Sequence, residues 1–229
     1  MWRELQRLTY DDVCRDSADR KPRMIDYFAL LGEPRRPWLD LELFEQKFRE
    51  LSAEAHPDRA HAAGERGRME AHKCFTDLNQ AFQCLRNPRT RLRHLLELSC
   101  GTKPQDLQQI TPELMELFND VGQVCRASSV LLNELESSSS ALVRVTLFRR
   151  GQGLLEAAVQ FQGKLSARRD ELLDEVRALD RAWEDSSLGQ GTEQLPALPW
   201  ARIEQIHRQL GFLDRWMDQL REVVARLHF

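Results

Sequence analysis

Apolar residues recur at intervals of three and four along most of this chain, which is the spacing that places them on one face of an α-helix. One series runs from Asp40 to about Ala55, and a second runs from about Met69 to Leu85. Asp40 suits the N-cap of the first helix, and Pro57 ends that helix because a proline disfavours helical geometry in the residue before it. The two apolar faces predict an antiparallel helical hairpin.

Shorter apolar segments flank the hairpin. The sequence DYFALLG, residues 26–32, is a compact apolar cluster that ends in a glycine and is soon followed by a proline, and we expect it to pack against the hairpin. After a break at Asn87 and Pro88, the sequence RTRLRHLLEL predicts a short basic helix that ends near Cys100. We assign both segments to the same unit as the hairpin.

The C-terminal half contains only long helical patterns. Thr111 and Pro112 have the character of an N-cap and a first helical residue, and they open the first pattern. A second apolar series spans roughly Leu142 to Trp183, and a third begins at about Pro199. Three long helices with one apolar face each predict an antiparallel three-helix bundle.

The predicted fold class is therefore all-α, with two helical units. Only two tyrosines and an abundance of Leu, Ala, Glu, Gln and Arg also favour helix over strand. The expected parts are an N-terminal extension that is either a short helix or disordered, a hairpin domain, a linker and a bundle, over residues 1–23, 24–100, 101–110 and 111–229.

Composition restricts the function further. The chain has 229 residues, 41% of them hydrophobic and 30% charged, with a net charge of -3. This near-neutral total gives no global indication of a nucleic-acid or membrane partner, so we expect neither, and any such case rests on local charge. Five widely spaced cysteines without a CxxC pair indicate reduced thiols and no metal site. The chain has no apolar run of ~20 residues and no signal-peptide pattern, so the predicted location is the cytoplasm.

The stretch AEAHPDRAH places His56, Pro57 and Asp58 at the predicted tip of the hairpin. Pro57 fixes its own φ and gives a stiff turn. His56 can donate or accept a hydrogen bond, and Asp58 can accept one from an arginine of a partner. These properties suit a recognition tip. In isolation, the same tripeptide is more simply a helix terminator followed by a polar loop.

The surroundings of the tripeptide favour recognition. The order DYFALLG, HPDR, NQAFQCLRNPRTRLRHLL and a three-helix tail containing LGFLDRWMDQL resembles the HscB type of J-domain co-chaperone. The resemblance covers about Ile25 to Phe229 and is strongest over residues 26–98. It implies a J-domain that stimulates the ATPase of a DnaK- or HscA-type chaperone, and a tail that binds an IscU-like iron-sulfur scaffold.

The resemblance also implies site residues. Those expected to contact the chaperone are His56, Pro57, Asp58, Lys47, Arg49 and Arg59. Those expected to form an exposed apolar patch for the scaffold are Leu114, Met115, Phe118 and Phe212. Because Phe212 lies beside the apolar stripe and not on it, we expect it to be partly exposed. The alternative is that all four patch residues are bundle core.

The chain departs from the family pattern at the chaperone-binding helix. The resemblance implies a basic docking face before the tripeptide, but this helix carries Lys47 and Arg49 against five acidic residues. Such charges act mainly on steering and register, so chaperone affinity or choice is affected. Acidic residues after the Leu-Met pair are mostly replaced, leaving Glu116 and Asp120. Cys14 alone cannot form the metal-binding segment that eukaryotic relatives carry, so no metal is expected.

No catalytic arrangement accompanies the tripeptide. His56 and Asp58 lack a nucleophile, a glycine-rich phosphate loop and an enclosed pocket, so we expect neither an enzyme nor a cofactor. The arginines of RNPRTRLRH form either a solvated face or an aid to chaperone docking. Two alternatives to the scaffold-delivering co-chaperone stay open. One is a general J-domain protein with another client, and the other is a structural adaptor that does not stimulate a chaperone.

Overall fold

The computed structural model describes residues 25–56, 64–100, 112–188 and 199–227. Within these ranges the chain forms seven helices and no strand, which confirms the all-α prediction. The predictions for residues 1–23 and 101–110 lie outside the described residues. In chain order the helices are α2 (Tyr27–Leu30), α3 (Leu41–Glu54), α4 (Gly64–Arg86), α5 (Pro88–Cys100), α6 (Pro112–Ser137), α7 (Ala141–Leu188) and α8 (Trp200–Leu227).

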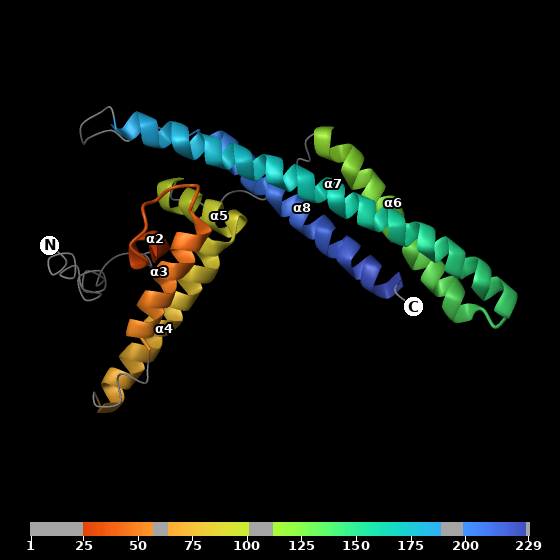
Figure 1. The fold of residues 1–229 in the computed structure, drawn as a ribbon, viewed down its shortest axis with the longest axis horizontal. Helices are drawn as coiled ribbons and strands as arrows, with labels where there is room; N and C mark the ends of the chain where they lie inside the picture. Colours follow the sequence, from red (N-terminus) through yellow and green to blue (C-terminus); the bar gives the residue numbers. More distant parts are fainter. Residues whose placement is uncertain (1–24, 57–63, 101–111, 189–198, 228–229) are drawn as a thin grey trace.

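Helices α3 and α4 form the predicted hairpin, which projects away from the three long helices (Figure 1). Asp40 begins α3 by accepting hydrogen bonds from the backbone nitrogens of Glu42 and Leu43. Aromatic stacking joins the two helices, because the Phe82 ring lies 3.9 Å from that of Phe48 and 5.4 Å from that of Phe44. Helix α4 begins earlier than predicted, since polar residues before its apolar series also adopt helix.

The short helix α2 packs against this hairpin. The Asp26 carboxylate caps it by accepting from the backbone nitrogens of Phe28 and Ala29 at 3.0 and 3.2 Å. Gly32 follows with a φ of 62°, a conformation that favours glycine and turns the chain. The Nζ of Lys47 donates to the Gly32 carbonyl at 2.6 Å, so α3 holds this turn in place.

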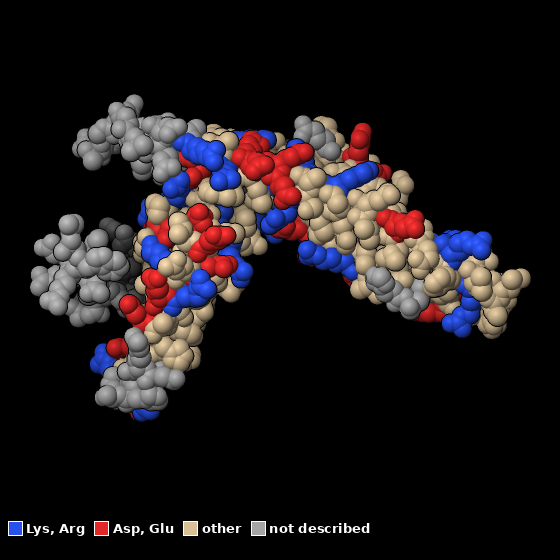
Figure 2. All heavy atoms as spheres, in the orientation of Figure 1, with Lys and Arg blue, Asp and Glu red and all other residues tan. Residues whose placement is uncertain are grey.

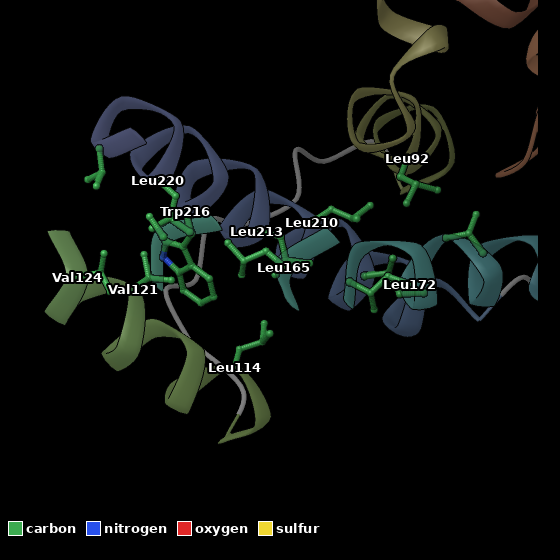
Figure 3. Close-up of a cluster of buried hydrophobic side chains, with 14 of the residues drawn as sticks. Leu92, Leu114, Val121, Val124, Leu165, Leu172, Leu210, Leu213, Trp216 and Leu220 are labelled. Atoms are coloured by element: carbon green, nitrogen blue, oxygen red, sulfur yellow. The ribbon is translucent and has the colours of Figure 1, made fainter. Parts of the chain in front are cut away.

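Helices α6, α7 and α8 form the predicted three-helix bundle. Helices α7 and α8 are antiparallel, because Glu175 of α7 pairs with Arg202 near the start of α8, and Arg169 pairs with Asp214 further along it. Figure 3 shows leucines and valines of all three helices pointing into a shared apolar cluster around Trp216. The middle helix reaches Leu188, beyond the predicted end.

Helix α5 belongs to both units. Its Leu95 lies in the hairpin core, whereas Leu92 and Leu96 lie in the bundle core. Trp200, at the start of α8, packs against both cores. The prediction assigned α5 to the hairpin unit, but its two apolar sides serve two different neighbours.

Buried and partly buried polar groups lie where the hairpin unit meets the bundle. Arg36 Nε donates to Asp180 Oδ1 at 3.0 Å, and the backbone nitrogen of Trp38 donates to the same oxygen at 3.2 Å. Arg91 is buried and donates to the carbonyls of Pro37 and Leu85 at 2.9 and 2.8 Å. The Nδ1 atom of the His207 ring lies 3.1 Å from the backbone carbonyl oxygen of Arg89. We call these five residues the joint: Arg36, Arg89, Arg91, Asp180 and His207.

Candidate functional site

His56 lies at the free end of the hairpin. Helix α3 ends at Glu54, and the exposed His56 follows directly after the Ala55 C-cap. Its ring meets the ring of Phe75, from α4, edge-on at 5.6 Å. This contact orients the imidazole while leaving it accessible to a partner. The other three residues predicted at this tip, Pro57, Asp58 and Arg59, lie outside the described residues.

The two bases of α3 have different environments. Lys47 donates to Gly32 and pairs with the Glu33 carboxylate at 2.8 Å, so its ammonium is an internal tie between α3 and the turn after α2. Its side chain is still 40% exposed, and a contact of Lys47 with a chaperone stays a prediction. Arg49 is exposed. The exposed acidic residues of the same helix are Glu42, Glu50 and Glu54.

A second exposed surface lies where α6 and α8 meet. Met115 and Phe118 are 43% and 44% exposed, and their spacing of three places them on the same side of α6. The rings of Phe118 and Phe212 each lie 5.9 Å from the buried ring of Trp216. We call this surface the Trp216 patch: Met115, Phe118, Phe212 and Trp216. The first and last bundle helices are therefore neighbours at the predicted residues.

Leu114 does not share this surface. Its side chain is 1% exposed and points into the bundle core (Figure 3). Consecutive helix positions differ by ~100° around the axis, so exposing Met115 turns Leu114 inward. The core alternative is therefore correct for Leu114. Phe212 is half-buried, as expected from its position beside the stripe, and the Arg215 guanidinium lies 5.0 Å from its ring centroid.

The sequence-based site omitted two residues that organise these surfaces. Trp216 forms the floor of the patch, and its signal is an aromatic residue one helical turn after Phe212. Asp180 anchors the joint. The sequence feature that could have identified it is the interval of four that it shares with the core residues Leu172 and Val176. A carboxylate at such a position requires a buried partner, but the periodicity does not identify Arg36.

The described cysteines are buried or partly buried thiols. Cys74, Cys84 and Cys125 are unpaired, and burial raises the pKa of each thiol. A raised pKa lowers the thiolate fraction and hence the reactivity. Within the described ranges, no group of three His, Cys, Asp or Glu residues is arranged to hold a metal ion. None of the helices described there combines the length and hydropathy needed to cross a bilayer.

Comparison with known proteins yields relatives of one kind. No family model matches the chain. The co-chaperone protein HscB of Proteus mirabilis is 34% identical over 74 residues, which cover 32% of this chain and 43% of that protein. The co-chaperone protein HscB homolog of Bordetella avium is 32% identical over 128 residues, which cover 51% of this chain and 74% of the relative.

Solved structures agree on the fold. The chaperone HscB from Vibrio cholerae matches with a TM-score of 0.56 and 24% identity, over 89% of this chain and 99% of that one. The human co-chaperone protein HscB matches with a TM-score of 0.55 and 16% identity, over 92% and 87%. The chain therefore shares the HscB fold, a helical J-domain followed by a C-terminal helical bundle. The chain belongs to the HscB co-chaperone family.

Proposed function

We propose that this protein stimulates the ATPase of a DnaK- or HscA-type chaperone through the hairpin tip and delivers an IscU-like iron-sulfur scaffold through the Trp216 patch. One observation carries the proposal. The same molecule presents an exposed His56 at the end of α3 and, on other helices, an exposed aromatic patch, with the buried joint between the two units. In this proposal the protein catalyses no bond chemistry and acts in the cytoplasm.

The proposed mechanism is coupling between two bound partners. A scaffold held on the Trp216 patch raises the effective concentration of the hairpin tip at the chaperone that receives it, and the reverse also holds. A fixed relation between tip and patch increases this effect, because less freedom is lost when both are engaged. The ion pair between Arg36 and Asp180 and the contact of the His207 ring with the Arg89 carbonyl join the two units and supply that fixed relation.

The proposed chaperone contacts are His56, Pro57, Asp58, Arg49 and Arg59. Lys47 is engaged internally and therefore contributes less. With Glu42, Glu50 and Glu54 exposed on α3, electrostatic attraction to an acidic chaperone surface is weak, so we expect slow association that depends little on salt. In this proposal, the J-domain comprises residues 24–100 and the scaffold-binding bundle comprises residues 111–229.

The test of the tip compares two histidines of the hairpin. His56→Gln abolishes stimulation of single-turnover ATP hydrolysis by the chaperone, because it removes a recognition group at the tip. His72→Gln is the matched control, since His72 is also an exposed histidine and lies on α4. We expect the control to stimulate like the wild type. Full stimulation by the His56 variant would refute the proposed role of the tip.

The test of the patch measures scaffold binding by calorimetry. Met115→Ala with Phe212→Ala removes two apolar anchors and weakens binding by roughly thirtyfold or more, since a central anchor is worth ~2 kcal/mol. The matched control is Val130→Ala with Val159→Ala, two half-exposed valines of the same bundle outside the patch. Unchanged binding by the patch variant would exclude this surface and leave a general J-domain protein with another client.

A structural adaptor is the second candidate. Its support is the acidic outer face of α3 together with the internal engagement of Lys47. The same ATPase assay separates the two candidates, because an adaptor gives no stimulation even as wild type. Scaffold binding without stimulation would then assign the protein to client recruitment alone.

A further inference from the structure

The end of the α6–α7 pair lacks the third helix of the bundle. Figure 1 shows that α8 ends well before the turn between α6 and α7, so this turn protrudes from the rest of the molecule. The first two turns of α7 expose four large apolar side chains there. Leu142 is 79% exposed and Val145 is 60% exposed, and about half of each of the other two is exposed: Val143 and Phe148.

The same end is locally basic. Residues 134–150, which comprise the turn and the helix ends beside it, contain three arginines and two glutamates, giving a charge of +1 in a chain whose net charge is -3. Arg150 pairs with Glu134 of α6 at 2.7 Å, whereas Arg144 and Arg149 are exposed. Figure 2 shows basic side chains beside uncharged surface at this end of the molecule. Arg144 lies in the first turn of α7, where a positive charge opposes the helix dipole, so its charge does not serve the stability of the helix.

We infer that this end of the α6–α7 pair binds the surface of a membrane that contains anionic phospholipids. We call it the basic apolar tip: Leu142, Val143, Arg144, Val145, Phe148 and Arg149. Its basic charge complements the negative surface potential of such a membrane, and its apolar side chains enter the boundary between headgroups and acyl chains.

The arrangement of the side chains favours a bilayer over a protein groove. Successive helix residues turn by ~100°, so positions 142, 145 and 148 lie within about 120° of one another and position 143 extends the exposed apolar arc to about 220°. A groove contacts one side of a helix, whereas the membrane interface surrounds an inserted end. Such a distribution therefore suits lipid.

The spacing along the axis also fits. Leu142 and Arg149 are separated by about 10 Å along α7 at 1.5 Å per residue. With the tip end-on to a bilayer, the apolar residues occupy the 5–10 Å of interfacial depth that amphipathic segments reach, to order of magnitude. Arg149 then lies at the level of the phosphates. The long side chain of Arg144 can extend back to the same level.

This local charge differs from the expectation drawn from the whole chain. The near-neutral total predicted no membrane partner, because it averages the basic tip with acidic residues elsewhere. Two basic side chains and four apolar ones give weak, reversible binding, since stable anchoring normally requires a stronger signal. The tip is remote in sequence from the proposed chaperone contacts near the end of α3 and from the proposed scaffold contacts near the start of α6 and on α8.

The test is flotation of the full chain with vesicles of two compositions. One contains phosphatidylcholine with about one third phosphatidylserine, and the other contains phosphatidylcholine alone. We expect binding to the first that decreases as salt is raised, and little binding to the second. Arg144→Gln with Arg149→Gln lowers partitioning by about thirtyfold, at about fivefold for each arginine. Leu142→Ser with Phe148→Ser lowers it by about tenfold or more.

Matched controls lie outside the tip. Arg126→Gln with Arg181→Gln removes two exposed arginines of α6 and α7, and Val159→Ser removes a half-exposed valine of α7. Both controls should float like the wild type, and thermal unfolding checks that every variant is folded. Failure of the wild type to bind anionic vesicles would overturn the inference and leave an acidic protein surface as the occupant. Equal losses in the control variants would also overturn it.

Discussion

The histidine of the joint, His207, and the histidine of the hairpin tip, His56, have opposite environments. At the joint, Arg91, Asp180 and His207 are buried and hydrogen-bonded across segments far apart in sequence. At the tip, His56 is exposed and its ring meets that of Phe75 on the adjacent helix edge-on. Polar residues thus stabilise the molecule at the joint, whereas the exposed His56 has the proposed role of meeting a partner.

This difference shows why residue type alone is a poor guide to function here. The sequence predicts recognition for the HPD tripeptide, and either a solvated face or an aid to chaperone docking for the arginine-rich stretch from Arg86 to Arg93. Arg91 instead fastens α5 to the segment before α3, and its pKa is lowered to about 10 because burial disfavours the charged form. The burial of Arg91 sets it apart from the exposed His56.

The largest expected effect comes from Arg91→Ala. This change leaves a cavity and removes the donors from the carbonyls of Pro37 and Leu85. We expect the free energy of unfolding to fall by about 4 kcal/mol, measured by urea titration. Arg93→Ala, which removes an exposed arginine of the same helix, is the control and should cost far less. Equal costs for the two would contradict a structural joint.

Asp180→Asn should have the next largest effect. It leaves Arg36 without a counter-charge in a largely buried position, and breaking such pairs costs roughly 3–5 kcal/mol. Because Arg36 keeps some exposure to water, we expect about 3 kcal/mol. Glu171→Gln, in the exposed pair with Arg168, is the matched control and should change stability by less than about 0.5 kcal/mol. The same urea titration measures both.

His94 lies one turn beyond Arg91, and we expect it to make a smaller, pH-dependent contribution to the free energy of unfolding. Its Nε2 accepts from the backbone nitrogen of Tyr27 at 3.0 Å, and its ring stacks on those of Tyr27 and Phe28. Burial is the main cause of its lowered pKa, partly opposed by the Asp26 carboxylate. The unfolded chain therefore binds a proton at a higher pH than the folded one, with a pKa near 6.5. Stability is full above about pH 6.5 and falls as the pH decreases below it.

Unfolding free energies at about pH 7.5 and 5.5 check this prediction. His94→Gln should flatten the dependence, because the group that takes up the proton on unfolding is gone. His72→Gln, an exposed histidine of α4, should leave the slope as in the wild type. An unchanged slope in the His94 variant would show that other groups cause it.

The smallest expected effect is at the tip itself. His56→Gln should change the free energy of unfolding by no more than about 0.5 kcal/mol, because the side chain is exposed. Urea titration of this variant beside Arg91→Ala tests the comparison directly. A cost above about 2 kcal/mol would place His56 with the structural residues and weaken its proposed role in recognition.

The helices were predictable because their signals are local. Spacings of three and four gave α3, α6 and α8 within a few residues, and Asp40 caps α3 as its side-chain chemistry indicates. The start of α4 was predicted too late, because its first turns are polar and show no apolar period. Phe212 was placed as partly exposed from its position beside the stripe, whereas the patch implied by resemblance wrongly included Leu114.

The sequence by itself determined the helices, their apolar faces and the polar tip at His56, because periodicity, caps and proline geometry act within a few residues. Only the tertiary structure decided that Lys47 is an internal tie, that α5 serves two cores and that Asp180 meets Arg36 across 144 positions. It also decided that α8 stops short of the α6–α7 turn, which leaves the basic apolar tip exposed. Such outcomes depend on which faces meet in space, and periodicity gives the direction of a face but not its neighbour.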